Sequence, residues 1–97
     1  MSLGDLRTQI DDIDEQLVSL LHRRADIAHE VGTIKAKAGL PIVDREREGA
    51  IMRKIMMPSR SSIDAAVIAR IYGEILLESR RIQQAAIRDV IRKGETV

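Results

Sequence analysis

"LRTQIDDIDEQLVSLLHRRADIAHEVGTIKAKAG", residues 6–39, decides the fold of this chain. Its large aliphatic residues recur at spacings of three and four, which predicts one long amphipathic helix over about residues 5–38. Gly39, followed by Pro41, marks the end of that helix. A single cation, Arg24, interrupts the apolar stripe of this helix, whose aliphatic members are Leu6, Ile10, Ile13, Leu17, Leu20, Ile27, Val31 and Ile34.

Two more helices are predicted downstream. Asp44 is a good N-cap for a short helix over about residues 44–56. Ser61 or Ser62 is the expected N-cap of a third helix over about residues 63–91. No segment shows the alternating pattern of a strand, so we expect an all-α fold with a single helical domain over residues 1–97.

The length of the first helix indicates an oligomer. A helix of about 34 residues is about 51 Å long, whereas a compact domain of about 100 residues has a radius of gyration of about 13 Å. The apolar stripe nevertheless continues to both ends of the helix, and a second copy of the chain is the simplest cover for it. We therefore expect an obligate homodimer with interlocked long helices.

The composition argues against several classes of protein. The 97 residues include 16 Lys or Arg and 15 Asp or Glu, and Tyr72 is the one aromatic residue, so the chain lacks the charge and the stacking platforms of a nucleic-acid-binding surface. No apolar run approaches the roughly 20 residues of a membrane span. The absence of cysteine leaves no disulfide or thiolate metal site and fits a reducing compartment. We expect a cytoplasmic protein that binds neither nucleic acid nor membranes.

Polar side chains interrupt the predicted apolar stripes. Arg24 and Lys35 project from nearly the same face of the first helix, about 16 Å apart. They either bracket a small anion, or extend to solvent or pair with carboxylates of another helix. Ser79 and Gln83, four residues apart on the third helix, need partners, and an inter-helix hydrogen bond would equally supply them.

Further charges lie in "DRERE", which begins at Asp44. Asp44 is explained as an N-cap, while Arg47 and Glu48 belong either to a solvated face or to the edge of the core. Arg7 lies about 25 Å from Arg24 along the same helix. These two arginines meet at one small ligand only if Arg7 comes from a partner chain.

Together these residues predict a small, highly charged pocket enclosed by helices. Its cations, carboxylates, amide and hydroxyl suit the binding of a small anion and the stabilisation of developing charge. His22 and His29 lack a nucleophile at a recognisable spacing, and the sequence has no metal motif or glycine-rich phosphate loop. We therefore expect neither a metal nor a cofactor.

The chain resembles the all-helical chorismate mutase family over about residues 3–86. The resemblance rests on "LRTQIDDIDEQLVSLLHRR", "EVGTIKAKAGLPIVDREREGAI" and "ILLESRRIQQ". The family pattern has an Arg early in the first helix, an Arg and then a Lys later in it, Asp-x-x-Arg-Glu at the second helix and Ser-x-x-x-Gln on the third. In this sequence those positions are Arg7, Arg24, Lys35, Asp44, Arg47, Glu48, Ser79 and Gln83.

The resemblance implies the rearrangement of chorismate to prephenate, on the route to phenylalanine and tyrosine. It also implies an interlocked homodimer with two active sites, each completed by Arg7 of the partner subunit. Because the reaction is an intramolecular pericyclic shift, catalysis would come from positioning and electrostatics rather than from a nucleophile, a base or a cofactor.

The resemblance also implies a role for each residue, with Lys35, Gln83 and Arg24 as the catalytic set. Arg24 and the partner's Arg7 would clamp the two carboxylates of chorismate. Lys35 and Gln83 would donate hydrogen bonds to the ether oxygen. The supporting contacts would come from Arg47 and Ser79 at the carboxylate end, and from Glu48 with the Asp44 region at the ring hydroxyl.

Two other functions stay open. Isochorismate–pyruvate lyase activity occurs on the same scaffold, and product analysis with the two substrates separates it from the mutase. A non-catalytic helical dimerisation or regulatory module would keep the apolar stripes without placing polar residues inside them, and binding of a dicarboxylate transition-state mimic discriminates it. The sequence also leaves open whether the chain stands alone or belongs to a larger bifunctional enzyme.

Overall fold

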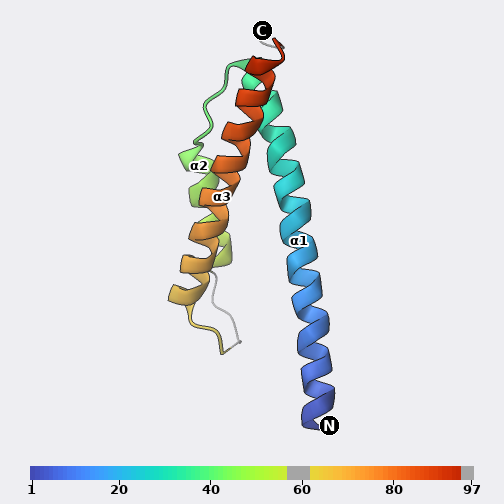
Figure 1. The fold of residues 1–97 in the computed structure, drawn as a ribbon. Helices are drawn as coiled ribbons and strands as arrows, with labels where there is room; N and C mark the ends of the chain where they lie inside the picture. Colours follow the sequence, from blue (N-terminus) through green and yellow to red (C-terminus); the bar gives the residue numbers. More distant parts are fainter. Residues whose placement is uncertain (57–61, 95–97) are drawn as a thin grey trace.

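The computed structural model describes residues 1–56 and 62–94, which form three helices (Figure 1). Helix α1 spans Leu3–Ala38, α2 spans Arg45–Ile55 and α3 spans Ala65–Arg92. No strand occurs in these described ranges, so the all-α class and the three predicted helices are confirmed, with each end within two residues of its predicted position. None of the helices in the described ranges combines the length and apolar character of a membrane span.

Local capping contacts explain where the first two helices begin and end. At the start of α1, Ser2 Oγ accepts a hydrogen bond from the Asp5 N–H, and the Ser2 N–H donates to the Asp5 carboxylate, both at 3.1 Å. Helix α1 ends at Gly39, whose φ of 67° lies in the left-handed region that favours glycine. Asp44 caps α2 as predicted, because its Oδ1 accepts from the Arg47 N–H at 2.9 Å.

The start of α3 differs from the prediction. Its N-cap is Asp64, whose Oδ1 accepts from the Ala66 N–H at 2.8 Å. The predicted cap at Ser62 is therefore wrong, and Ser61 lies outside the described residues. Aspartate caps a helix as well as serine does, and its negative charge also complements the positive end of the helix dipole. Helix α3 accordingly begins two residues later than predicted.

The three helices do not form a compact body. Helices α1 and α3 converge near the C-terminal end of α1, while the N-terminal half of α1 extends away from the other two described helices (Figure 1). The chain measures 58 × 26 × 14 Å and has a radius of gyration of 17.3 Å. That radius exceeds the roughly 13 Å of a compact domain of about this size.

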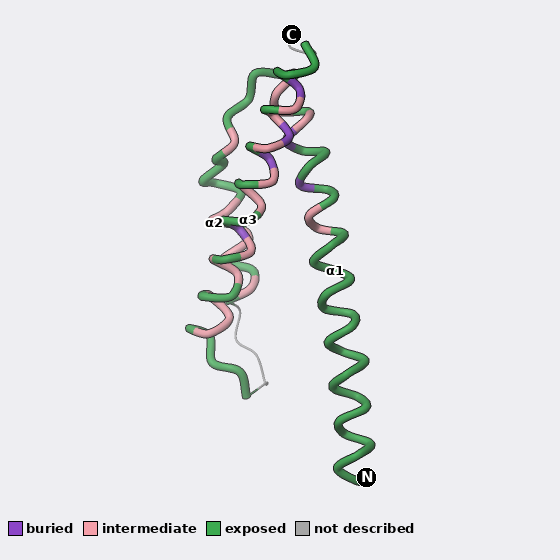
Figure 2. The backbone as a smooth tube through the Cα atoms, viewed as in Figure 1, coloured by how far each residue is buried: buried purple, intermediate pink, exposed green. Residues whose placement is uncertain are grey.

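Small residues form the contact between α1 and α3. Ala28, Ala86 and Val90 are at most 6% exposed, and Gly32 is buried as well. Figure 2 shows these buried positions where the two helices meet. A Cβ on Gly32 would lie 2.7 Å from the Cα of Gln83. The two backbones therefore approach as closely as a glycine permits.

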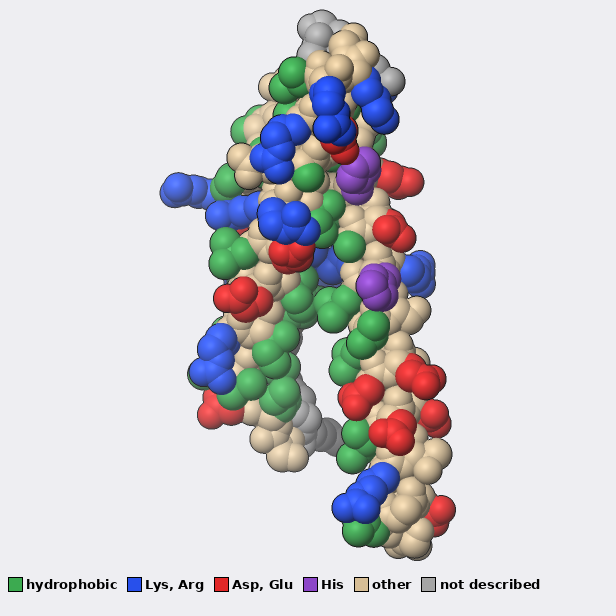
Figure 3. Space-filling view, in the orientation of Figure 1, with side chains coloured by type: hydrophobic (Ala, Val, Ile, Leu, Met, Phe, Trp, Pro, Cys, Tyr) green, Lys and Arg blue, Asp and Glu red, His purple; other side chains and the backbone are tan. Residues whose placement is uncertain are grey.

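The predicted apolar stripe of α1 stays on the surface of the single chain. Figure 3 shows hydrophobic side chains along the edge of α1 that faces α3, where the two helices diverge. Burial of one such side chain contributes about 1.5–3 kcal/mol, so one chain leaves much hydrophobic stabilisation unrealised. The exposed apolar face is consistent with a homodimer in which a second copy covers it. The homodimer stays a prediction. The stripe residues are 36–63% exposed: Leu6, Ile10, Ile13, Leu17, Leu20, Ile27, Val31 and Ile34.

Candidate active site

A cavity of about 400 Å³ lies between the three helices and the connection from α1 to α2. Its volume falls within the roughly 300–1,000 Å³ that is typical of small-molecule sites. Apolar side chains such as Ile27, Ile51 and Leu76 form part of its wall. Seven of the eight predicted site residues also line it: Arg24, Lys35, Asp44, Arg47, Glu48, Ser79 and Gln83.

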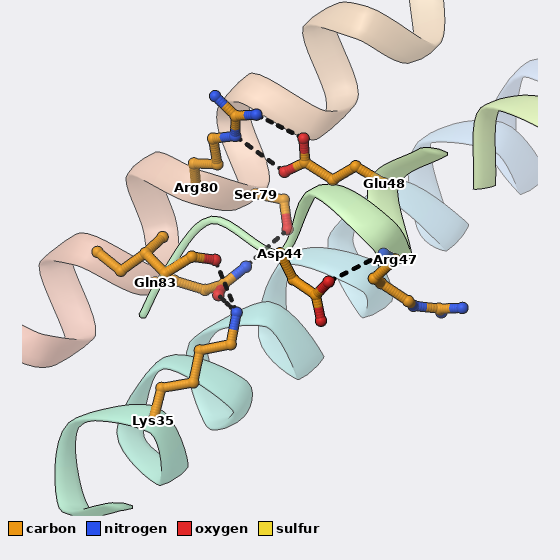
Figure 4. A network of polar contacts seen from close by, with 8 residues as sticks. Lys35, Asp44, Arg47, Glu48, Ser79, Arg80 and Gln83 are labelled. Atoms are coloured by element: carbon orange, nitrogen blue, oxygen red, sulfur yellow. Dashed lines mark hydrogen bonds and ion pairs between the residues drawn. The ribbon is translucent and has the colours of Figure 1, made fainter. Parts of the chain in front are cut away.

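Lys35 is the centre of a hydrogen-bond network that connects α1 to α3 (Figure 4). Its Nζ donates to Gln83 Oε1 and to the Ile42 carbonyl oxygen, both at 2.7 Å. Because the ammonium group has only donors, it orients the Gln83 amide with its oxygen toward Lys35. The amide nitrogen then donates to Ser79 Oγ at 3.3 Å. Lys35 thus points toward α3 and not along α1 toward Arg24, although both residues line the cavity.

This network leaves hydrogen-bond donors available to a ligand. An ammonium group has three N–H donors and a side-chain amide has two. Within the described residues, Lys35 uses two of its donors and Gln83 uses one. Gln83 is only 8% exposed, and hydrogen bonds are stronger in such a low-dielectric setting. Each residue therefore keeps one N–H that no described residue accepts, and both residues line the cavity.

Glu48 of α2 forms an ion pair with Arg80 of α3. Arg80 Nε donates to Glu48 Oε2 at 2.8 Å, and Arg80 Nη2 donates to Glu48 Oε1. These hydrogen bonds hold the pKa of the Glu48 carboxyl below its ordinary value, so Glu48 is ionised at neutral pH. Glu48 lines the cavity, whereas Arg80 does not.

Arg24 and Arg47 supply positive charge that has no partner in the described part of the chain. Both line the cavity, and within residues 1–56 and 62–94 no carboxylate forms an ion pair with either guanidinium. Arg24 is half-buried, where an uncompensated charge is costly. The alternative in which Arg24 pairs with a carboxylate of its own chain is therefore not observed in these ranges. A bound anion would supply the missing counter-charge.

Arg7 is the one predicted site residue that does not line this cavity. It is exposed near the start of α1, in the half of the helix that extends away from α3 (Figure 1). At 1.5 Å per residue, it lies about 25 Å from Arg24 along the helix axis. A single chain does not bring the two arginines together, and the contribution of Arg7 from a partner chain stays a prediction.

Two residues that shape the site were not predicted. Gly32 allows the close approach of α1 to α3. A sequence signal for it exists, because Ala25, Ala28 and Gly32 repeat small residues at spacings of three and four. Arg80 has no comparable signal, since only the docking of α2 on α3 shows that it pairs with Glu48.

The site is equipped to bind a small anion and to stabilise developing charge. It combines cations, an amide and a hydroxyl with the Glu48 carboxylate, which accepts hydrogen bonds. The described residues that line it include neither histidine nor cysteine, and the Ser79 hydroxyl accepts a hydrogen bond from the Gln83 amide, which is not a base. Within the described residues, no group of three or more His, Asp or Glu is arranged to hold a metal ion. A site without metal or cofactor stays a prediction.

The chain matches a known protein family along most of its length. The model of that family, chorismate mutase type II, covers residues 6–84 and so includes all eight predicted positions. The chain belongs to this family. The resemblance inferred from the sequence is therefore confirmed.

Relatives of this chorismate mutase family member include a chorismate mutase of similar length and a longer bifunctional protein. The bifunctional chorismate mutase/prephenate dehydratase of Aquifex aeolicus is 40% identical over 78 residues, which are 76% of this chain and 22% of that protein. The chorismate mutase of Methanocaldococcus jannaschii is 27% identical over 94 residues, which are 96% of this chain and 95% of that protein. The chain thus spans about a fifth of the fused relative and nearly all of the separate one.

A solved structure shares the fold. The crystal structure of chorismate mutase from Helicobacter pylori in complex with prephenate matches with a TM-score of 0.75 and 29% identity. The match covers 89% of this chain and 93% of that chain. The helical architecture described above is therefore that of the family.

Proposed function

We propose that this chain catalyses the rearrangement of chorismate to prephenate in the cytoplasm. The observation that carries the proposal is the cavity of about 400 Å³ where seven residues of the mutase pattern meet. Family membership and the prephenate complex of the Helicobacter pylori relative support it. An intramolecular pericyclic shift needs no nucleophile, which agrees with a cavity lined by cations, an amide and a hydroxyl.

Positioning is the first part of the proposed mechanism. Arg24 and the partner's Arg7 hold the two substrate carboxylates, because a guanidinium matches a carboxylate in a two-point contact. Arg47 and Ser79 line the same cavity and support the carboxylate end. Fixing both carboxylates selects the compact conformer in which the two reacting carbons lie together, and this removes the entropic cost of finding it.

Charge stabilisation is the second part. The ether oxygen gains negative charge as its bond to carbon breaks, and Lys35 and Gln83 direct their remaining N–H groups at that oxygen. These contacts strengthen as the charge grows, so they stabilise the transition state more than the bound substrate. The Ile42 carbonyl holds Lys35 in place beforehand at 2.7 Å. Because an amide donates without first gaining a proton, we expect activity to persist through neutral pH.

The ring hydroxyl of chorismate is the remaining polar group of the substrate to be placed. The ionised Glu48 carboxylate accepts its hydrogen bond, next to the Asp44 carboxylate at the start of α2. A hydrogen bond to a charged acceptor is worth about 1.5–3 kcal/mol. This contact fixes the ring relative to the ether oxygen that faces Lys35.

The proposed enzyme is a homodimer in which each subunit completes the site of the other. Two observations support this arrangement. The aliphatic residues Leu6, Ile10 and Ile13 are 44–57% exposed in a single chain. Arg7 is also about 25 Å from the site of its own chain. A second copy laid along α1 covers the apolar face and carries its own Arg7 toward the cavity.

A complementation experiment tests the shared site. Arg7→Ala and Arg24→Ala are each expected to be inactive as homodimers. In a mixed dimer, the chain that keeps Arg24 receives Arg7 from its partner, so one of the two sites is complete. Refolding an equal mixture should therefore restore about a quarter of the wild-type activity, since half of the dimers are mixed. If Arg7 served its own chain, the mixture would stay inactive.

Chorismate consumption by the purified chain, with no added metal or cofactor, tests the reaction itself. Prephenate as the product is the expected result. Release of pyruvate, particularly from isochorismate, would reassign the site to lyase chemistry. Absence of turnover in an intact dimer would favour the non-catalytic helical module. Binding of a dicarboxylate transition-state mimic then reports whether the cavity holds a dianion at all.

A further inference from the structure

Glu48 lies where two hollows of the molecule adjoin. On one side lies the cavity described above, and on the other lies a groove of about 920 Å³ between α2, α3 and the connection after α1. Glu48 lines both hollows, as do Lys35, Asp44 and Leu76, whereas Arg80 lines the groove but not the cavity. Arg80 of α3 points toward the Glu48 carboxylate of α2 (Figure 4), and it is not among the residues that line the cavity.

The contact between Arg80 and Glu48 restricts the carboxylate in two ways. Hydrogen bonds from Nε and Nη2 to the two carboxylate oxygens set both the position and the rotation of the group. The side chains of Arg80 and Glu48 are 37% and 21% exposed, so the pair is only partly screened by water. Each carboxylate oxygen has two acceptor sites, and Glu48 therefore keeps capacity for a hydroxyl donor in the cavity.

Other charges around Glu48 act in both directions. Lys35 of α1 and Arg80 of α3 favour the ionised carboxylate, while Asp44 at the start of α2 opposes it. Arg24 and Arg47 add positive charge around the same cavity. Among these groups, only Arg80 makes hydrogen bonds to Glu48, and it is the largest cause of the lowered pKa.

We infer that Arg80 is a positioning residue, which holds the Glu48 carboxylate in place and turned toward the ring hydroxyl of the substrate. This inference rests on the proposed function and adds a residue outside the eight of the family pattern. Arg80 does not line the cavity in which the substrate is proposed to bind, so we expect it to act through Glu48.

The test is kcat/KM for chorismate against pH in the full-length Arg80→Gln and Arg80→Lys variants. Arg80→Gln should lower kcat/KM roughly 10- to 100-fold, since a misplacement of about 1 Å in a positioning group costs up to about 10²-fold. The acid limb of its pH profile should also move toward neutral pH, because Glu48 then gains a proton more readily. Arg80→Lys keeps the positive charge but loses the two-point contact with the carboxylate. Compared with Arg80→Gln, it should therefore return the acid limb toward its wild-type position while kcat/KM stays low.

A double-mutant cycle separates this role from a structural one. If Arg80 acts through Glu48, then Arg80→Gln should change kcat/KM by less than about 2-fold in a Glu48→Gln background. An equal loss in both backgrounds, or an unmoved acid limb, would overturn the inference. Arg92→Gln is the matched control, because Arg92 pairs with Asp89 on the same helix and lies outside the cavity.

Two further measurements keep failures distinguishable. Wild-type turnover is measured first, since its absence refutes the proposed function itself, whereas wild-type turnover with no effect of Arg80→Gln refutes only the inference. The carboxyl ¹³C shift of Glu48 against pH reports its ionisation without any substrate. Its pKa should rise in Arg80→Gln, and an unchanged titration would count against the inference. Circular dichroism shows whether each variant keeps its helices.

Discussion

Replacement of Gly32 by alanine should push α1 and α3 apart. The new Cβ would lie 2.7 Å from both the Cα and the carbonyl oxygen of Gln83, and 2.9 Å from the Cβ of Ala86. The first two are backbone atoms, which have no rotamer to change. Ordinary carbon–carbon contact needs about 3.5 Å, so the helices must separate locally by roughly 0.8 Å.

Two opposing free-energy terms set the effect on stability. Alanine favours a helix over glycine by about 1 kcal/mol, whereas overpacking costs about 1–3 kcal/mol. Gly73→Ala is the matched control, because Gly73 lies inside α3 and an added Cβ there has no heavy atom within 4 Å. The control therefore changes only the helix propensity, without the overpacking cost. The free energies of unfolding of the two variants should therefore differ by about 1–3 kcal/mol, with Gly32→Ala the less stable.

The separation should also reduce activity. Gly32 lies one turn before Lys35 on α1 and contacts Gln83, so the shift acts on the 2.7 Å hydrogen bond between Lys35 and Gln83. A displacement of about 1 Å can cost up to about 10²-fold in rate, and we expect kcat to fall by at least about 10-fold.

Urea unfolding followed by circular dichroism, at one fixed protein concentration, measures the stability of each variant. Steady-state chorismate turnover measures the activity. A Gly32→Ala protein that is as stable as Gly73→Ala and as active as the wild type would refute the close-contact reasoning.

Three other changes probe the same site. Lys35→Ala should lower kcat about 10²- to 10³-fold, as loss of a charge-stabilising donor does, and a nearly normal steady-state rate would contradict its catalytic role. Gln83→Glu should be weakly active at neutral pH and regain activity as the pH falls, because an ionised carboxylate beside Lys35 cannot donate a hydrogen bond. An activity-against-pH profile as flat as that of the wild type would count against this role of Gln83. Glu48 has a lowered pKa in the folded chain, so its stabilising contribution is present above the ordinary glutamate pKa and is lost as the pH falls through the folded value. The unfolding free energy should therefore fall more steeply in acid for the wild type than for Glu48→Gln, and equal slopes in urea titrations would exclude the linkage.

The helices were predictable because their determinants are local. The periodicity of α1 lies within one segment, and the caps at Asp44 and Gly39 act on neighbours no more than four residues away. The predicted cap at Ser62 was wrong because several polar residues before α3 are suitable caps, and Asp64 makes the contact.

The membership of the site was also predictable in large part. Arg24 and Gln83 stand out because a polar residue in an apolar stripe requires a partner. Their common cavity follows from the order and spacing of the family pattern. The partner of Lys35 did not follow in the same way, because the spacing suggested only that Lys35 and Arg24 bracket an anion or contact solvent or carboxylates, whereas the structure supplies Gln83.

By itself the sequence determined three helices, an exposed apolar stripe on the longest one and the residue types of an anion site. Only the tertiary structure decided that Gly32 sets the distance between α1 and α3, and that Arg80 holds Glu48. The physical reason is range. Periodicity and caps depend on residues within about a turn or two, while the Lys35–Gln83 contact joins positions 48 residues apart and the Glu48–Arg80 contact joins positions 32 apart. Such contacts depend on how two surfaces pack, and no local pattern encodes the distance between them.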